Sequence, residues 1–381
     1  MRVLPLPETT ICPGAIRQIP DALKGLGART VMVVTDPGLV KAGVFEKIRV
    51  LLDGAGIQVK LCDRVKPDPS IKLVQSVAAE ANGEKLQAVI GLGGGSSIDT
   101  AKIAAALATN NRSVNDYLGG AALENDSLPI IAVPTTAGTG SEATHIAILS
   151  DEDEQLKKGL TSLKLMPKFA FLDPELTLGL PPAVTAATGM DALCHAIESF
   201  TSVNANDFSE TLSLKAVQLL NDNILEVFRN GGNLAAREKM LLGSFIAGTA
   251  FANAGVTAVH AFAYPIGGMF HVPHGLANSL MLSAVMRFNI HAAGERFARI
   301  GEVMSCGRSK TPQTVVQRVD ELVRLLALPR TLAAVGIPES ALEPMANAVM
   351  QITRLLKNNP REMTLPDARA IYAEAFRGGV N

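Results

Sequence analysis

The second half of the chain contains histidines and an aspartate whose types and spacing suit metal chemistry. In GMDALCHAIES, Asp191 and His195 stand four residues apart and so share one face of a helix. The later segment VHAFAYPIGGMFHVPHG supplies His260, His271 and His274. One carboxylate with several imidazoles suits Fe²⁺ or Zn²⁺. Each histidine alone is as readily a hydrogen-bonded core residue, but together they predict a metal site among buried helices.

A glycine-rich loop in the first half has the composition of a phosphate cradle. GLGGGSSIDTAK follows the apolar stretch LQAVI and precedes a helical pattern, yet it matches neither GxxxxGK[ST] nor GxGxxG. The glycines of the stretch Gly93–Ser97 let backbone N–H groups approach an anion, and a pyrophosphate is expected at the helix N-terminus that follows. Ser96 or Ser97 is expected to cap this helix, with Asp99 as a capping-box partner. An ordinary strand-to-helix turn is the alternative.

Two further positions extend this predicted ligand site. VPTTAGTGSEAT places Thr135, Thr136 and Ser141 in a second loop after a strand, and loops at the carboxyl ends of parallel strands form one crevice. Asp36 ends the first strand, where a carboxylate can hydrogen-bond a ribose diol. Its alternative role is to cap the helix that begins at Pro37.

The elements that must position these residues differ between the two halves. Apolar strands alternate with helical patterns up to about Leu180, which predicts an α/β domain with a parallel sheet and helices on both faces. From Pro181 onward the periodicity is almost entirely helical. We therefore expect a nucleotide-binding domain over 1–180 and an all-helical domain over 181–381.

Composition narrows the partners of the chain. A net charge of −1, no Trp and 4% aromatic residues give no basic surface or stacking platform, so no nucleic-acid partner is expected. Residues 240–286 lack Asp, Glu, Lys and Arg, but Pro265 and Pro273 interrupt them and no membrane span is expected. The four cysteines are dispersed and the N-terminus lacks a signal-like apolar run, so we expect a cytoplasmic protein.

Taken together, these motifs resemble the iron-dependent (group III) alcohol dehydrogenase family. The matching stretches are GLGGGSSIDTAK, PTTAGTGSEAT, DPELTLGLPP, GMDALCHAIES and VHAFAYPIGG with HVPHGLANSLMLSAVMRFN. The resemblance implies an NAD-binding sheet domain, a helical domain that holds Fe²⁺ (or Zn²⁺), an active site in the cleft between them, and a homodimer or higher homo-oligomer. Carried over by position, the metal ligands are Asp191, His195, His260 and His274. The cofactor-binding positions are Asp36, Gly94, Gly95, Ser96, Asp99, Thr135, Thr136, Ser141, Lys157 (or Lys158 in the adjacent register) and Leu176.

The chain departs from the family pattern at one position. Many members have a second histidine four residues after the third ligand, where this chain has Tyr264. That histidine is thought to relay protons, so the relay must differ here. His271 lies at a position where the residue varies among family members, and it is expected to line the cleft between the two predicted domains. We keep Tyr264 and His271 as candidate catalytic residues.

The resemblance implies reversible oxidation of a small alcohol to an aldehyde or ketone with NAD. A maleylacetate-type keto-acid reductase and a hydroxyacid–oxoacid transhydrogenase are alternatives, as is a cyclase of the dehydroquinate synthase type. The substrates of these alternative enzymes carry carboxylates, which need cationic partners. The absence of charged residues over 240–286 therefore disfavours them. From another class, a non-catalytic nucleotide-binding module would keep the loops without needing the full ligand set.

Overall fold

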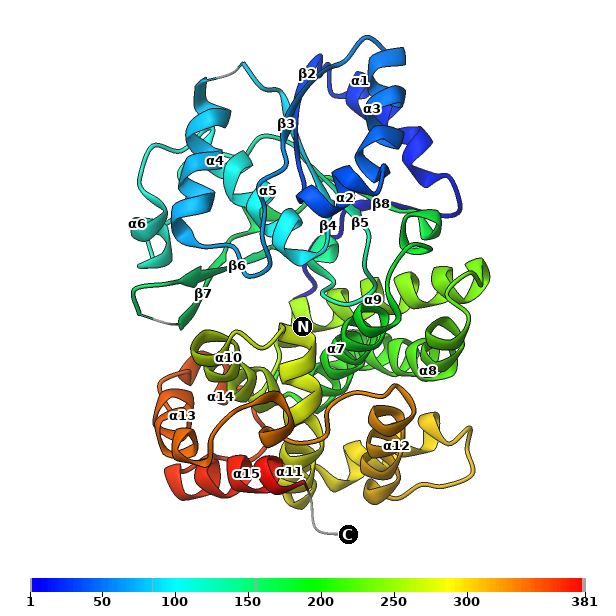
Figure 1. The fold of residues 1–381 in the computed structure, drawn as a ribbon, viewed down its shortest axis with the longest axis vertical. Coiled ribbons are helices and arrows are strands. Elements are labelled where there is room, and N and C mark those ends of the chain that lie inside the picture. The colour runs from blue at the N-terminus through cyan, green and yellow to red at the C-terminus, as the bar shows by residue number, and fades with distance from the viewer. Residues whose placement is uncertain (1, 84, 155, 379–381) are drawn as a thin grey trace. The chain divides into compact units, whose positions relative to one another are not determined.

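The structure, a computed structural model, describes residues 2–83, 85–154 and 156–378. They pack into two compact units, one of residues 5–179 and one of residues 180–378 with residues 2–4. The first unit is built on a six-stranded parallel sheet in the order β1-β8-β5-β4-β2-β3 (Figure 1). Its strands are β1 (Glu8–Ile11), β2 (Thr30–Val34), β3 (Gln58–Cys62), β4 (Ala88–Gly93), β5 (Ile130–Pro134) and β8 (Phe169–Leu172). This sheet, with a helical second half, confirms the predicted fold class.

Helices cover both faces of the sheet, as the alternating pattern predicts. They are α1 (Ile19–Gly25), α2 (Pro37–Lys41), α3 (Val44–Gly54), α4 (Ile71–Gly83), α5 (Gly95–Leu107) and α6 (Val114–Leu118). Val31 and Val33 of β2 join an apolar core with α1 and α3, whereas Met32 and Val34 join a core with α4 and α5. In Figure 1, α1 and α3 lie on one side of the strands and α4 and α5 on the other. Burial of both strand faces explains the continuous apolar runs in the sequence.

The predicted ligand loops leave the sheet at its carboxyl edge. Strand β2 pairs with β3 on one side and β4 on the other, and β4 pairs in turn with β5. The chain thus reverses direction across the sheet between β3 and β4. In parallel sheets a crevice opens outside the strand ends at such a reversal. Asp36, the loop at Gly94 and the loop at Thr135 all follow strands next to this point.

One part of the first unit differs from the sequence-based expectation. The alternating pattern predicts a parallel sheet, but β6 (Ile146–Asp151) pairs antiparallel with β7 (Leu156–Thr161) in a separate hairpin. Strand β7 contains Lys157, Lys158 and only two apolar residues, so apolar periodicity does not predict it. Short 3₁₀ turns complete the unit: η1 (Ala15–Gln18), η2 (Ser141–Ala143), η3 (Leu163–Leu165) and η4 (Pro174–Thr177).

The second unit contains helices and no strand among its described residues. They are α7 (Pro182–Thr201), α8 (Asp207–Arg229), α9 (Leu234–Ala254), α10 (Ala258–Phe270), α11 (His274–Met304), α12 (Pro312–Leu325), α13 (Leu342–Val349), α14 (Thr353–Leu356) and α15 (Leu365–Arg377), with 3₁₀ turns η5 (Ala333–Val335) and η6 (Glu339–Ala341). Helix α7 is mostly buried from Thr185 onward. Its apolar residues form the centre of the unit, so the polar groups among them need partners inside the protein.

The uncharged segment, residues 240–286, forms most of α9, all of α10 and the first part of α11. Within the described residues, no single helix is long and apolar enough to cross a membrane. Helices α9 and α10 meet that test only as a pair, and they are bent by 105° at the break between them. Most residues of α10 are buried inside the unit.

Candidate functional site

The predicted metal ligands converge at one point inside the helical unit. Asp191 and His195 lie on α7, His260 is near the start of α10, and His274 is the first residue of α11. The Nε2 atoms of His195 and His260 are 2.9 Å apart. The Asp191 Oδ1 atom lies 3.9 Å from Nε2 of His260 and 3.9 Å from Nε2 of His274. The structure thus brings together donors that the sequence separates widely.

The donor set suits a divalent cation. Asp191, His195 and His260 are 2%, 5% and 3% exposed, and their ligand atoms lie within 4.8 Å of one another. Buried lone pairs that face one another repel unless a positive centre lies between them. His274 is more open, with 27% of its side chain exposed, so one side of the cluster is accessible. Carboxylate and imidazole donors in this arrangement fit Fe²⁺ or Zn²⁺.

Asn278, one turn after His274 on α11, completes this cluster and was missed from the sequence. Its side-chain Nδ2 lies 2.7 Å from Oδ1 of Asp191, 3.1 Å from Nε2 of His260 and 3.2 Å from Nε2 of His274. Its Oδ1 atom is buried without a hydrogen-bond partner. The Asn278 amide nitrogen is therefore shared among the carboxylate and two imidazoles of the cluster. The spacing from His274, i to i+4 on one helix, was the available signal.

Glu198 is a second residue that sequence reasoning missed. It lies one turn after His195 on α7 and is 1% exposed. Its Oε1 accepts hydrogen bonds from the Thr257 hydroxyl at 2.7 Å and the Val259 N–H at 2.8 Å, so it caps the N-terminus of α10. Its Oε2 contacts Nδ1 of His260. Because a carboxylate only accepts, Nδ1 carries the proton and Nε2 keeps its lone pair for the donor cluster.

The electrostatics of Glu198 agree with this role. Burial disfavours its charged form, but the His260 imidazole and the hydrogen bonds from His260 and Thr257 together hold the pKa of Glu198 below its usual value. The pKa of the nearby Cys194 thiol shifts in the opposite direction. Burial, followed by the Glu198 and Asp191 carboxylates, raises the pKa of Cys194 well above its usual value. Cys194 is therefore protonated at neutral pH and is a poor metal ligand.

A glycine at position 275 allows α11 to pack closely against α7, which brings His274 into the donor cluster. A Cβ atom at Gly275 would overlap the Ala187 carbonyl oxygen, so no larger residue fits there without displacing a helix. The His195 ring also stacks on Phe251 of α9, with ring centroids 4.5 Å apart. Backbone contact and ring stacking therefore fix the helices that hold the donors.

The two candidate catalytic residues occupy different positions. Tyr264 is 7% exposed, and its ring centroid is 6.3 Å from that of His274. His271 is exposed at the C-cap of α10 and adopts a left-handed backbone with φ of 54°. Tyr264 therefore borders the donor cluster, whereas His271 belongs to the turn between α10 and α11.

The glycine loop of the first unit has an open helix N-terminus. Helix α5 begins after Gly94, and no side chain caps it. The expected cap by Ser96 or Ser97 is therefore wrong, because both lie inside the helix. Gly93 has φ of 147°, a conformation that side chains rarely adopt. The uncapped N–H groups of the first turn leave a place for an anion.

Asp99 is also absent from the cap, because its carboxylate is used elsewhere. It accepts hydrogen bonds from the Ser141 hydroxyl and, at 2.8 Å, from the Ile148 N–H. Lys102, fully buried, donates to Ser141 at 3.0 Å and to the Ile146 carbonyl at 2.7 Å. These bonds join α5 to the loop after β5 and to the hairpin. Asp99 and Ser141 thus hold the two predicted cofactor loops together.

Burial is the main cause of the pKa shifts of Asp99, Lys102 and Glu142. It lowers the pKa of Lys102 to about 8 and raises the pKa of Asp99. It also raises the pKa of nearby Glu142 to about 7, and Oε1 of Glu142 has no hydrogen-bond partner. The sequence contains no pattern that distinguishes these buried charges from exposed ones.

The remaining predicted cofactor residues all lie in the first unit. Asp36 caps α2 by accepting a hydrogen bond from the Leu39 N–H at 3.0 Å, its alternative role from the sequence. Thr135 is buried and donates its backbone N–H to Gly93, whereas Thr136 is half-buried. Of the two alternative lysines, Lys157 forms a 2.6 Å ion pair with Asp68, and Lys158 pairs with Asp151 and Glu154. Leu176 is buried in the apolar core that also contains Ile131 and Val133.

Comparisons with known proteins match nearly the whole chain. Residues 7–174 match the family model for iron-containing alcohol dehydrogenase, and residues 185–376 match the model for the C-terminal part of the Fe-containing alcohol dehydrogenase family. The chain is 42% identical to long-chain-alcohol dehydrogenase 1 of Geobacillus thermodenitrificans over 96% of this chain and 94% of that protein. It is 32% identical to NAD-dependent methanol dehydrogenase of Bacillus methanolicus, over 97% and 98% of the two chains. The crystal structure of a 1,3-propanediol oxidoreductase superposes with a TM-score of 0.95 at 34% identity, over 99% of this chain and 100% of that one.

Proposed function

The chain belongs to the iron-containing alcohol dehydrogenase family, and we propose that it transfers a hydride between NAD(H) and a small alcohol or the matching aldehyde or ketone. The convergence of Asp191, His195, His260 and His274 is the observation that carries this proposal. A non-catalytic nucleotide-binding module has no need for such a donor set. The matched relatives are named for long-chain alcohols, methanol and propanediol. They share alcohol oxidation but differ in the length of the alcohol, so the proposal specifies the reaction and leaves the chain length to the assay.

In this proposal the four residues hold Fe²⁺, with Zn²⁺ as the alternative. A bound divalent metal supplies Lewis-acid attraction for the alcohol oxygen. Asp191 contributes one negative charge and the three imidazoles are neutral, so the site keeps net positive charge toward an alkoxide. Glu198 holds the proton of His260 at Nδ1, and Asn278 orients Asp191. Tyr264 and His271 stay candidate catalytic residues.

The first unit binds NAD in this proposal. The N-terminus of α5 at Gly94, Gly95 and Ser96 holds the pyrophosphate, and Asp36 accepts a hydrogen bond from the adenosine ribose. The other proposed cofactor-binding positions are Asp99, Thr135, Thr136, Ser141, Lys157 and Leu176. Asp99 and Ser141 act by positioning the loops, since their side chains bond to each other. We further propose a cytoplasmic homodimer or higher homo-oligomer.

Acidic substrates fit the helical unit less well. A maleylacetate-type reductase or a hydroxyacid–oxoacid transhydrogenase needs cations to pair with its carboxylates. The segment that carries His260 and His274 has no Lys or Arg from residue 240 to residue 286. Neutral alcohols and carbonyl compounds need no such partner, and they are therefore the proposed substrates.

The test is a turnover assay of the metal-depleted protein after addition of Fe²⁺ or Zn²⁺. Primary alcohols of increasing length with NAD⁺, and the matching aldehydes with NADH, are followed by absorbance of the reduced cofactor. We expect turnover only with metal. His260→Ala should lose both metal and turnover, whereas the matched variant His271→Ala should keep its metal. Full activity of metal-free protein, or wild-type metal content in His260→Ala, would contradict the proposal.

A further inference from the structure

The turn between α8 and α9 contains one of the two Asn–Gly pairs of the sequence, Asn230–Gly231. The other pair, Asn82–Gly83, ends α4. The backbone nitrogen of a residue can attack the side-chain amide of an asparagine that precedes it, and a glycine places no Cβ atom in the path of this attack. Because the two pairs have the same residue types, the backbone around each pair decides which one reacts.

Asn230 is exposed and its backbone is not helical. It is the C-cap of α8, with φ of −129° and ψ of 77°. Its side-chain Nδ2 has one hydrogen-bond partner among the described residues, Oε1 of Glu226, at a long distance of 3.4 Å. Within the same part of the chain, the Gly231 N–H group donates to no acceptor. The amide and the nitrogen that attacks it are therefore held by little else.

Asn82 is exposed as well, but it lies inside a helix. A helical backbone directs the nitrogen of the following residue to the carbonyl four positions earlier. It also tilts each Cα–Cβ bond toward the N-terminus of the helix, so the Asn82 amide points away from the Gly83 nitrogen. The helix therefore protects Asn82 from the attack to which Asn230 is open.

We propose that Asn230 is a site of spontaneous deamidation in the folded protein. The Gly231 nitrogen attacks Cγ of Asn230 and forms a C–N bond, and ammonia leaves with the proton of that nitrogen. Water then opens the succinimide ring at one of its two carbonyls. One product is aspartate, and the other is isoaspartate, whose main chain is longer by one CH₂ group. The reaction needs only water, so it does not depend on the proposed enzymatic function.

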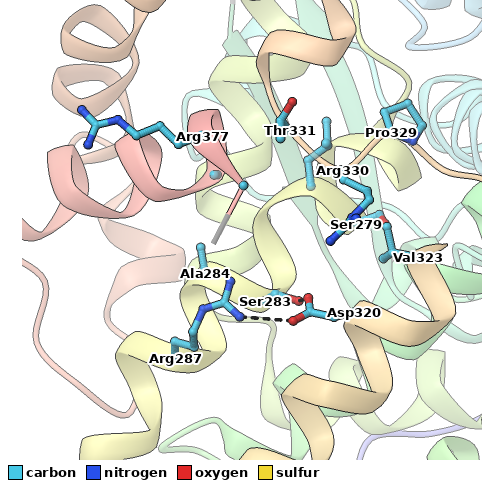
Figure 2. A pocket seen from close by; sticks show the side chains of 13 residues that line it. Ser279, Ser283, Ala284, Arg287, Asp320, Val323, Pro329, Arg330, Thr331 and Arg377 are labelled. Carbon is cyan, nitrogen blue, oxygen red and sulfur yellow. Dashed lines mark hydrogen bonds and ion pairs between the residues drawn. The ribbon is translucent and has the colours of Figure 1, made fainter. Parts of the chain in front are cut away.

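The isoaspartate product disturbs the contacts of Arg237, which is 3% exposed. Its Nε donates to the Gly231 carbonyl at 3.0 Å, and its Nη1 donates to the Thr185 hydroxyl of α7 at 2.9 Å. Arg287 pairs with the Asp320 carboxylate at 3.3 Å (Figure 2), whereas the hydrogen bonds of Arg237 within the described residues all go to neutral oxygens. A longer main chain moves the Gly231 carbonyl away from this buried cation, so we expect deamidation to lower stability.

The experiment is incubation of the metal-loaded full chain in mildly alkaline buffer, followed by peptide mapping with mass spectrometry. Isoaspartate is counted by the transfer of a labelled methyl group from S-adenosylmethionine by an isoaspartate methyltransferase. We expect conversion at Asn230 to be about tenfold faster than at Asn82 in the folded protein, because only Asn82 is held in a helix. In urea the two rates should converge. A ratio of rates that is the same in the folded and the unfolded chain would overturn the proposal.

Gly231→Ala and Gly232→Ala form a matched pair of variants. A Cβ atom at Gly231 crowds the attacking nitrogen and restricts its backbone, so Gly231→Ala should slow conversion at Asn230 by about tenfold. The atom nearest to that Cβ is Nη2 of Arg237, the end of a flexible side chain, so the variant should fold. Gly232→Ala leaves the attacking nitrogen unchanged and should keep the wild-type rate. Equal rates in the two variants would contradict the proposed attack.

Asn230→Gln tests the reaction without a change at the glycine. Its longer side chain must close a six-membered ring, which forms more slowly, so its melting temperature should stay constant during the incubation. The wild type should lose a few degrees as isoaspartate accumulates. A fully converted wild type with an unchanged melting temperature would refute the expected loss of the Arg237 contact. The absence of any conversion at Asn230 would refute the site itself.

Discussion

The Glu198 carboxylate contacts Nδ1 of His260, and this contact leaves Nε2 of the imidazole facing Asp191 as a lone pair. The same carboxylate caps α10 through Thr257 and Val259. One buried residue therefore sets both the position of the helix and the tautomer of the proposed ligand. Outer carboxylates of this kind orient metal-binding histidines.

Glu198→Gln should weaken metal binding by about 10- to 100-fold while the protein stays folded. The amide oxygen can still accept from Thr257 and Val259, so its NH₂ group must face His260. Nδ1 then becomes an acceptor, and the imidazole proton moves to Nε2, the atom that a metal needs. Affinity is measured by chelator competition. Glu339→Gln, an exposed residue of the same unit, is the control, and a change of less than twofold in Glu198→Gln would refute this role.

Tyr264→Phe should lower kcat by about tenfold or less with the metal retained. General acid–base catalysis contributes about 10²–10⁴ only where the group itself transfers the proton. Tyr372→Phe is a matched control, because its buried hydroxyl donates to the Phe262 carbonyl at 2.8 Å. That variant should lose about 1 kcal/mol of stability and keep its kcat. A thousandfold loss in Tyr264→Phe with full metal content would make Tyr264 the proton-transfer residue.

Asp36→Asn should raise the NADP⁺/NAD⁺ ratio of kcat/KM by at least about tenfold. Two like charges about 4 Å apart at an effective dielectric near 20 repel by about 4 kcal/mol before screening, and 1.4 kcal/mol is a factor of ten. The wild type should prefer NAD⁺ by roughly tenfold to a thousandfold. The asparagine keeps an oxygen for the Leu39 N–H, so α2 stays capped. An unchanged ratio would limit Asp36 to capping.

The free energy of unfolding of Glu142→Gln should increase relative to that of the wild type as the pH rises from 5 to 8. Burial raises the pKa of Glu142 from 4.5 to about 7, so between these values the folded state keeps a proton that the unfolded chain releases. The contribution of this group to stability is therefore present below pH 4.5 and is lost as the pH rises through 7. The amide cannot ionise, and the difference should reach at most about 3 kcal/mol. Urea unfolding at both pH values measures it, with exposed Glu152→Gln as the control. A pH-independent difference would place the Glu142 carboxylate in contact with water.

The parallel sheet and the helical second half were predictable because both follow from apolar periodicity. The donors of the cluster were predictable because Asp191 and His195 share one helix face, and because the motifs around all four residues resemble those of a known family. Glu198 and Asn278 were not identified, since a Glu or an Asn on a helix is normally exposed and only packing shows that these are buried. The hairpin of β6 and β7 was missed for a similar reason. Its second strand carries Lys157, whose partner Asp68 lies 89 positions away, beyond the range of local patterns.

The donor cluster also has a consequence for the folding of the chain. Its residues come from α7, α10 and α11, and His195 and His260 are separated by 65 positions along the chain. An ion held at this point acts as a reversible cross-link that closes a long loop, and it binds the native state in preference to the unfolded chain. At a free ion concentration 100 times its Kd, such a cross-link adds about 2.7 kcal/mol to the unfolding free energy. The melting temperature of this protein should therefore report the free metal concentration of its solution.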